Sequence, residues 1–449
     1  MAKANKANFL QEVKEQYEDY PYPPRDPQSE KIGIMAPYVE MPDRLNHYCF
    51  GGKKQFDKNF RILVAGGGTG DTTIYTAEQY GTLGAEVVHV DLSKASIAIA
   101  KERAEIRGLK NNITFLHASL LDIPKMGLGK FDYINCSGVL HHLNDPEEGL
   151  ASLTSVLSPE GVMCLMVYGK YGRLGVYPLQ DALRTMLRNV DSRAKKIKMT
   201  RDLLSNLPLG NWFMFAQKMF REDLATDSGI FDLLLHPQDR AYTIPELYEF
   251  VASAGLKSIS LQHPFTSGAR IYDPSHFILN EALQSEIESL TPIEKQALAE
   301  NLSCNIIMHT FYAARYDLTE PDETDENFIP VVNYSFSAHM KPFLKMVLTA
   351  EGNNIMFMNP MMNDPIIVDI FPSTAALVLA MDGNRTIGNI LDEVSQRMNL
   401  SREEVSRHFK QLYKDLRAHD IVFLRHSSVP AYVTPDVLHA NSLKRTAKK

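Results

Sequence analysis

The glycine-rich segment 66–70, Gly-Gly-Gly-Thr-Gly, is the clearest candidate for chemistry in this sequence. The apolar run at 60–65 predicts a buried strand before it, and residues 72–80 predict a helix after it. A strand that enters a helix through glycines lets the backbone approach a ligand closely, and the free amides at the helix start favour a polar ligand. The segment therefore predicts a nucleotide or cofactor site.

Two acidic residues near this turn narrow the class of ligand. The dinucleotide-binding fingerprint needs glycine at position 71, where this chain has Asp71. A carboxylate there would repel a pyrophosphate, whereas a cofactor with an ammonium and a sulfonium tolerates it. Asp91 ends the next predicted strand, about 20 residues beyond the glycines, where an acid can accept hydrogen bonds from both ribose hydroxyls. A helix cap is the alternative role for Asp91.

Together with a third block, these residues resemble the class I S-adenosylmethionine-dependent methyltransferase family. The matching blocks are 62–70, 90–93 and 131–143, and the resemblance covers about residues 50–170. It implies a Rossmann-like fold and S-adenosyl-L-methionine as cofactor. The residues that it implies for cofactor binding are Ala65, Gly66, Gly67, Gly68, Gly70, Asp91, Leu92, Ser119, Leu120 and Ser137. By this resemblance Ala65 and the glycines line the methionine part, Asp91 binds the ribose and Leu92 packs on the adenine.

Two positions depart from the pattern of the family. Many members carry an acid where this chain has Val64, and another where it has Ser119. The contacts that those acids make with the cofactor are therefore open here, whereas the backbone cradle of the glycine turn is retained.

Methyl transfer is an in-line displacement, so the protein mainly aligns the acceptor and provides an unprotonated nucleophile. The candidate catalytic residues are His141, His142, Tyr20, Tyr22 and Tyr168. The two histidines follow the fourth predicted strand, at the end where ligands bind in open α/β sheets; packing is their alternative role. The two tyrosines of the N-terminal segment either cover the cofactor or fasten the segment to the sheet. Tyr168 and the segment 236–240 are candidates for the acceptor pocket from their position.

Strands and helices alternate from residue 60 to 168, which predicts an α/β fold with a doubly wound, mostly parallel sheet. After residue 168 we expect helical insertions at about 172–235 and 262–302, with strands at 256–261 and 305–314 that close the edge of the sheet. The expected regions are an N-terminal Tyr/Pro-rich arm (1–50), the methyltransferase domain (51–316), an acidic linker (317–336), a small α+β winged-helix-like domain (337–426) and a tail (427–449).

The C-terminal region resembles the winged-helix module that binds leader peptides in peptide-modifying enzymes. The resemblance rests on 371–376, 381–387 and the helices expected at 386–398 and 401–418. In those modules a peptide adds as a strand to the edge of a sheet. A structural or dimerising winged helix is the alternative. The region after Tyr168 has a looser resemblance to bacterial protein-lysine methyltransferases.

Composition limits the partners. The formal net charge of −7 disfavours nucleic acid, whose phosphates need a basic face, and no apolar run reaches the ~20 residues that span a bilayer, so we expect no membrane partner. Four well-separated cysteines, without a Cys/His cluster for a metal, favour reduced thiols and a cytoplasmic location. The basic stretch 184–201 is either a solvated helix face or a docking surface for an acidic partner.

The sequence thus predicts a methyltransferase that acts on a nucleophile of a peptide or protein. A small-molecule acceptor is the first alternative, and a cofactor-binding regulatory protein without turnover is the second. A homodimer is compatible with each of them.

Overall fold

The computed structural model describes residues 13–262, 268–278, 280–358, 365–433 and 435. The first and last segments of the chain, 1–12 and 436–449, lie outside the described residues, and with them lie the start of the predicted N-terminal arm and most of the predicted tail. Residues 13–19 are helical.

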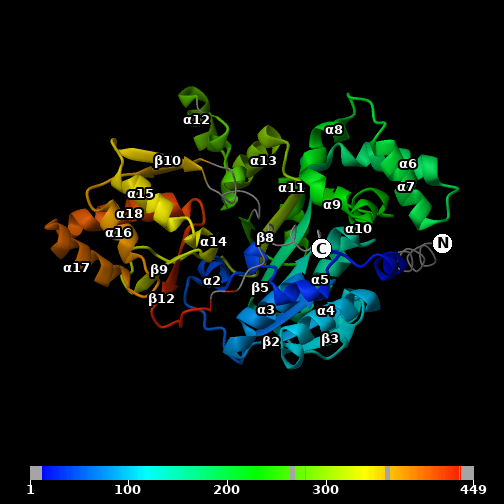
Figure 1. Cartoon of the computed structure of the whole chain (residues 1–449), viewed down its shortest axis with the longest axis horizontal. Coiled ribbons are helices and arrows are strands. Elements are labelled where there is room, and N and C mark those ends of the chain that lie inside the picture. Colours follow the sequence, from blue (N-terminus) through cyan, green and yellow to red (C-terminus); the bar gives the residue numbers. More distant parts are fainter. Residues whose placement is uncertain (1–12, 263–267, 279, 359–364, 434, 436–449) are drawn as a thin grey trace.

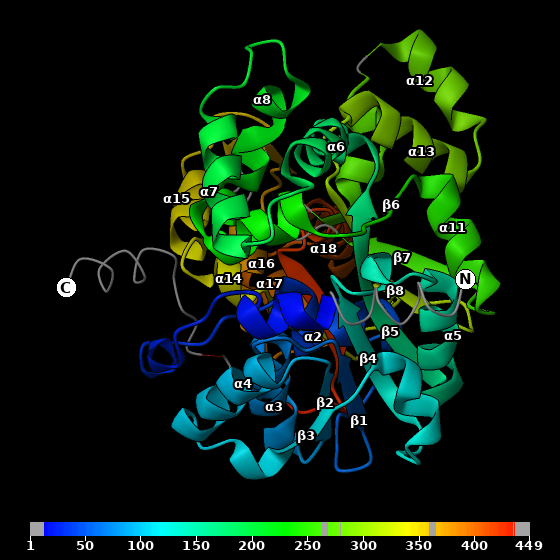
Figure 2. The ribbon, with the colours of Figure 1, turned by 90° about the vertical axis from the view of Figure 1, so that its right-hand side faces the viewer.

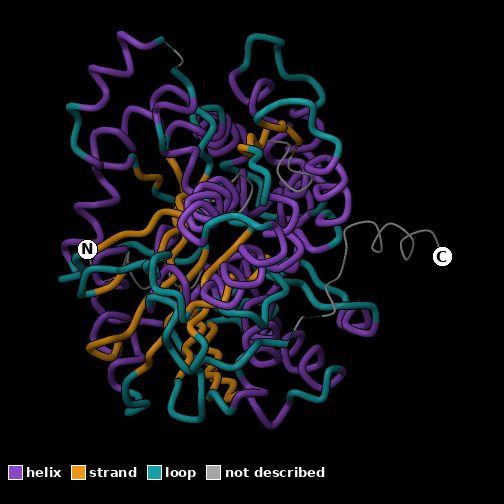
Figure 3. Tube along the Cα trace, turned by 90° about the vertical axis from the view of Figure 1, so that its left-hand side faces the viewer, coloured by secondary structure: helices purple, strands orange, loops and turns teal. Residues whose placement is uncertain are grey.

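The centre of the molecule is an eight-stranded sheet, whose strands lie between helices in Figure 3. Its path is β3-β2-β1-β4-β5-β8-β7, and β6 pairs with β5 outside this path. All pairs are parallel except β5–β8 and β8–β7. The strands are β1 (Arg61–Ala65), β2 (Glu86–Asp91), β3 (Ile113–His117), β4 (Phe131–Ser137), β5 (Leu157–Gly169), β6 (Ala241–Tyr242), β7 (Ser258–Gln262) and β8 (Met308–Ala314). The predicted Rossmann-like sheet, closed by two late strands, is confirmed.

Helices cover both faces of this sheet because successive strand residues point to opposite sides. Leu63 packs on the face covered by α5 and α11, whereas Ile62 and Val64 pack on the face covered by α2, α3 and α4. These helices are α2 (Pro42–Phe50), α3 (Asp71–Gln79), α4 (Lys94–Ile106), α5 (Pro146–Val156) and α11 (Ile244–Ser253). Ser93 caps α4 by accepting a hydrogen bond from the amide of Ser96. The N-cap of α4 is therefore Ser93, and the alternative role of Asp91 as a helix cap is wrong.

Residues 172–235, predicted as an insertion, form a helical lobe at one end of the molecule in Figure 1. Its helices are α6 (Val176–Leu187), α7 (Arg193–Leu204), α8 (Trp212–Ala216), α9 (Arg221–Ala225) and α10 (Asp227–Ile230), followed by a π-helical turn, Phe231–Leu235. The lobe has a core of its own, built on Leu179, Leu183, Phe213 and Phe220. The second insertion contains α12 (Glu281–Glu288) and α13 (Pro292–Ser303).

The C-terminal part lies at the opposite end of the molecule from the helical lobe in Figure 1. It has a separate core. Strand β10 pairs with β11 and β9 pairs with β12, both antiparallel. The elements are β9 (Phe328–Val332), α14 (Tyr334–Ser337), α15 (Met340–Leu348), β10 (Asn354–Met358), β11 (Pro365–Asp369), α16 (Thr374–Ala380), α17 (Ile387–Met398), α18 (Arg402–Arg417) and β12 (Val422–His426). The small α+β domain is present, and its winged-helix character stays a prediction.

The segment 317–336, predicted as a solvated linker, differs from that prediction in two respects. Strand β9 lies inside it with Phe328 and Ile329 buried, and Glu320 forms an ion pair with Arg417 at 2.5 Å. The many acids before residue 327 indicated a solvated segment, so the five-residue strand that follows them was not predicted. Its partner, β12, comes from the other end of the same domain's sequence.

The C-terminal domain packs firmly on α2. The buried Arg44 of α2 forms an ion pair with the buried Asp420 at 2.8 Å, and Tyr48 donates a hydrogen bond to the same carboxylate. Phe423 of β12 joins the core that covers one face of the central sheet. Figure 2 shows the last helices and β12 behind this sheet. The two domains therefore share a desolvated junction.

None of the described helices combines the length and the apolar character that crossing a bilayer requires. Cys49, Cys136 and Cys164 are buried, Cys304 is exposed, and none of them forms a disulfide. The cytoplasmic location stays a prediction.

Candidate cofactor and acceptor site

A cavity of about 250 Å³ lies at the carboxyl ends of β1, β2, β3 and β4, where the strand order reverses. Open α/β sheets bind ligands at this point. Ten of the predicted site residues line the cavity: Gly66, Gly67, Gly68, Asp91, Leu92, Ser119, Leu120, Ser137, Tyr22 and His142. Further lining residues, which the sequence did not indicate, include Tyr17, Pro23, Asn135 and Met166.

Five predicted residues do not line the cavity. The Ala65 side chain belongs to the core, and Gly70 begins α3, where an added Cβ would lie 2.9 Å from Cβ of Ala100. Tyr20 stacks on Phe231 with ring centroids 5.6 Å apart. His141 and Tyr168 lie behind His142, with their ring centroids 3.8 Å from each other. Tyr20 therefore fastens the arm to the lobe, and His141 packs behind the site.

The glycine turn needs glycine for its packing as well as for its exposed backbone. Gly66 and Gly68 have φ values of +73° and +51°, in the left-handed region that favours glycine. A Cβ on Gly66 would lie 2.4 Å from the Val139 side chain, and one on Gly68 would lie 2.5 Å from the carbonyl oxygen of Tyr22. The turn is thus enclosed by protein on one side and presents its backbone to the cavity on the other.

Asp91 bridges the end of β2 and the glycine turn. Its Oδ2 accepts a hydrogen bond from the amide of Gly68 at 2.7 Å, and its Oδ1 accepts one from the amide of Ser93 at 2.8 Å. Burial raises the pKa of Asp91, and these amides oppose the rise. Each carboxylate oxygen keeps a further lone pair, so the group can also accept hydrogen bonds from a ligand's hydroxyls.

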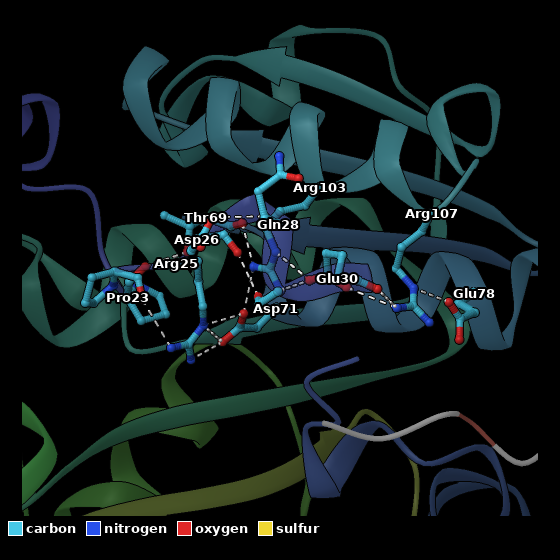
Figure 4. A network of polar contacts seen from close by, with 12 residues as sticks. Pro23, Arg25, Asp26, Gln28, Glu30, Thr69, Asp71, Glu78, Arg103 and Arg107 are labelled. Carbon is cyan, nitrogen blue, oxygen red and sulfur yellow. Dashed lines mark hydrogen bonds and ion pairs between the residues drawn. The ribbon is translucent and has the colours of Figure 1, made fainter. Parts of the chain in front are cut away.

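Asp71 is neutralised by two arginines (Figure 4). Its carboxylate lies 2.6 Å from Nη2 of Arg25 and 2.7 Å from Nη1 of Arg103. Although burial opposes it, these guanidinium groups lower the pKa of Asp71. The prediction that the carboxylate of Asp71 disfavours a pyrophosphate is therefore wrong, because two arginines balance its charge. Arg103 also donates to the carbonyl of Thr69 and pairs with the buried Glu30, so this network ties the N-terminal arm to the glycine turn.

The N-terminal arm forms one wall of the cavity. The hydroxyl of Thr69 donates to the carbonyl of Pro23 at 2.7 Å. Tyr22 donates from its phenol to Asp223 of the helical lobe at 2.9 Å, and Tyr17 donates to Asp232 at 3.1 Å. Burial raises the pKa of Asp223 to about 6. The arm therefore lines the cavity, and Tyr22 fastens it to the helical lobe, whereas the alternative role predicted for Tyr22 was attachment to the sheet.

A buried cluster of histidines and an acid lies beside the cavity. The three side chains His142, Asp232 and His236 place one ligand atom each within 4.8 Å of one another. Burial lowers the pKa of both histidines, so they are neutral near pH 7. Asp232 accepts hydrogen bonds from the phenols of Tyr17 and Tyr168.

The backbone of Gln238 gives the two histidines opposite tautomers. His142 Nδ1 lies 3.2 Å from the carbonyl oxygen of Gln238, which only accepts, so this nitrogen carries the proton and Nε2 accepts. His236 Nδ1 accepts from the amide of Gln238 at 3.2 Å, so its Nε2 carries the proton. The spacing of the cluster would suit a cation, but these hydrogen bonds favour a paired proton acceptor and donor.

Sequence reasoning missed Asp232, Asp223 and Tyr17. Asp232 did carry a signal, because it is the one acid in the apolar run 230–235 and a buried carboxylate needs hydrogen-bond donors around it. Asp223 and Tyr17 carry no comparable signal.

The buried acid Glu40 lies behind the wall of the cavity. Asn135 of β4 pairs in register with Val64 and donates from Nδ2 to Glu40 Oε1 at 2.6 Å. Tyr133 donates to the other oxygen of Glu40 at 2.7 Å. Burial raises the pKa of Glu40 to about 7, and these hydrogen bonds oppose the rise.

Comparison with known proteins gives three findings. Residues 63–163 match the model of a family described as "Methyltransferase domain". An uncharacterised protein of Synechococcus sp. is 30% identical over 323 residues, which are 71% of this chain and 75% of that protein. The tRNA 5-carboxymethoxyuridine methyltransferase of Escherichia coli K12 is 38% identical over 117 residues, 26% of this chain and 43% of the relative.

Among solved structures, PKMT2 from Rickettsia typhi in complex with AdoHcy aligns with a TM-score of 0.62 and 16% identity. The alignment covers 91% of this chain and 78% of that one, and it shows a shared fold. Together with the family match, these findings identify S-adenosyl-L-methionine as the cofactor.

Replacing Asp91 by asparagine should weaken S-adenosylmethionine binding, because one of its oxygens becomes a donor group. A hydrogen bond to a charged group contributes about 1.5–3 kcal/mol, so we expect roughly a tenfold to hundredfold rise in Kd by calorimetry. Asp145→Asn is the matched control, since Asp145 is an exposed cap of α5 and asparagine caps equally well. Unchanged affinity in a folded Asp91→Asn variant would contradict the assignment.

Proposed function

We propose that this chain, which belongs to the class I S-adenosylmethionine-dependent methyltransferases, transfers the methyl group to an amino nucleophile of a peptide or protein. The observation that carries this proposal is one side of the cavity, where the phenols of Tyr17 and Tyr22, which donate hydrogen bonds to Asp232 and Asp223, lie with the neutral His142. Carboxylates and aromatic rings attract a protonated amine, and a neutral imidazole can remove its proton.

Bound S-adenosylmethionine supplies a methyl group on a sulfonium, which needs an unprotonated nucleophile in line with it. His142 accepts the proton of the incoming amine at Nε2, because its Nδ1 proton is held by the carbonyl of Gln238. Asp232 then stabilises the imidazolium that forms, since its charge raises the pKa of His142. The arm residues Tyr17 and Tyr22 limit the access of water.

The peptide or protein nature of the acceptor rests on the C-terminal domain. This domain packs on α2, which follows Glu40 in the chain, and Glu40 lies behind Asn135 of the cavity wall; its sequence resembles peptide-binding modules. The fold shared with PKMT2 spans 91% of the chain but carries no information on the acceptor. The small-molecule alternative is supported by relatives named ubiquinone/menaquinone biosynthesis C-methyltransferases, which match about a quarter of this chain.

The acceptor class is tested by incubating the purified full chain with methyl-labelled cofactor and a cell lysate, followed by separation by size. We expect label in protein bands, and none with heat-denatured enzyme. Label confined to the small-molecule fraction would replace the peptide proposal by the metabolite alternative. Absence of label from both fractions, with normal cofactor binding, would favour the regulatory protein.

Replacing His142 by asparagine should slow methyl transfer, because asparagine can still donate to the Gln238 carbonyl but offers no basic nitrogen at the Nε2 position. With the acceptor found by labelling, we expect kcat to fall about 10²–10⁴-fold. The Kd of the cofactor should stay within about twofold. His426→Asn on β12 is the control outside the site. A kcat equal to that of the unaltered protein would exclude His142 as the base.

We also propose that Glu40 binds the ammonium group of the cofactor through Asn135. Among the described lining residues, the acids Asp71 and Asp91 are engaged by arginines and by backbone amides respectively. Asn135 donates its amide hydrogens to Glu40 and Ser137, so its carbonyl oxygen is left to accept from a cation. Glu40 then supplies the negative charge that the family's acid provides at the position of Val64.

Replacing Glu40 by glutamine should lower the affinity for S-adenosylhomocysteine roughly tenfold, which is the contribution of one hydrogen bond to a charged group. The affinity for 5′-methylthioadenosine should stay the same. The first ligand has the amino group and the second lacks it. Since the pKa of Glu40 is raised to about 7, its ionised form prevails above that pH. Calorimetry should show the affinity of the unaltered protein for S-adenosylhomocysteine rising from pH 6 to 8, with a flatter profile in the variant. Equal losses for both ligands would contradict the assignment.

A further inference from the structure

The outer surface of the helical lobe carries a group of exposed apolar side chains around α8. Leu209, Trp212, Phe215 and Met219 are 86%, 62%, 77% and 41% exposed, and Trp212 is the one tryptophan of the chain. Their neighbours Phe213 and Phe220 are buried in the core of the lobe, so α8 is anchored by one face and presents large apolar side chains with the other. Exposed apolar residues grouped in this way mark a contact surface. We call these four residues the α8 patch.

The lobe that carries the α8 patch has an excess of positive charge. Residues 172–235 contain ten Lys and Arg against seven Asp and Glu, whereas the whole chain has a formal net charge of −7. Lys218 is exposed between Phe215 and Met219, and Arg188, Lys195 and Lys198 are exposed on the α6–α7 hairpin of the same lobe. Among the described residues, no ion pair involves these four cations, in contrast to Arg184, Arg193 and Arg201.

We propose that the α8 patch inserts into the interface of an anionic lipid bilayer. Aromatic and aliphatic side chains with adjacent lysines and arginines are the combination that binds such interfaces. The loop before α8 projects from the molecule in both Figure 1 and Figure 2. A deformable bilayer accepts a projecting apolar tip without a matching groove, whereas a protein partner must supply one. The expectation of no membrane partner rested on spanning segments and did not consider side chains at the surface.

The single tryptophan provides a direct test with the full-length protein. Vesicles of phosphatidylcholine alone are compared with vesicles containing about one third phosphatidylglycerol, whose charge attracts basic residues. We expect a blue shift of Trp212 fluorescence and co-sedimentation with the anionic vesicles, and at least tenfold weaker binding to the neutral ones. Equal binding to both would overturn the role of charge, and absence of binding to anionic vesicles would overturn the proposal.

Variants separate the apolar and the electrostatic contributions. Phe215→Ser together with Leu209→Ser should weaken vesicle binding at least tenfold, whereas Leu348→Ser, a 65% exposed leucine of the C-terminal domain, should not. Each of Lys195→Glu and Lys198→Glu should weaken binding roughly fivefold or more, and Lys345→Glu on α15 should have no effect. Unchanged cofactor affinity verifies that each variant is folded.

If sedimentation velocity shows a dimer that Phe215→Ser dissociates, the patch binds a second copy and the membrane proposal is wrong.

Discussion

The buried guanidinium of Arg103 is the contact on which the rest of the site depends. It joins α4 to the carbonyl of Thr69 in the glycine turn, to Asp71 at the start of α3, and to Glu30 of the N-terminal arm. Removing one member of a buried ionic group leaves uncompensated charge and typically costs about 3–5 kcal/mol. The arm that this network holds then supplies Tyr17 and Tyr22 to the cavity. One set of ion pairs therefore positions both the glycine turn and part of the cavity wall.

The helical lobe completes that wall through a second set of contacts. Asp223 and Asp232 come from the lobe, and each accepts a hydrogen bond from a tyrosine of the arm. The loop that follows the lobe contains Gln238, whose carbonyl and amide orient two histidines in opposite ways. A single peptide backbone thus makes His142 a proton acceptor and His236 a proton donor. Neutral imidazoles in a buried site are retained because burial disfavours their charged forms.

The C-terminal domain is coupled to the same centre through a short stretch of sequence. Glu40 lies behind Asn135 at the cavity wall, and Arg44 and Tyr48 on the following helix bind Asp420 of the C-terminal domain. This domain is therefore attached to the segment that forms the back of the cavity, as well as through the chain at 317–327.

The sequence by itself determined the parts that depend on local pattern. A buried strand, a glycine turn and a helix cap are specified by neighbouring residues, so the glycine turn, the place of Asp91 at the end of its strand and the mostly parallel, Rossmann-like sheet followed from residues 60–168. Only the tertiary structure decided the partners of each charged or polar group. His141 and His142 are identical in type and adjacent in sequence, yet one packs against Tyr168 and the other faces the cavity. The charge of Asp71 is balanced by arginines that are distant in sequence, and packing alone brings those groups together.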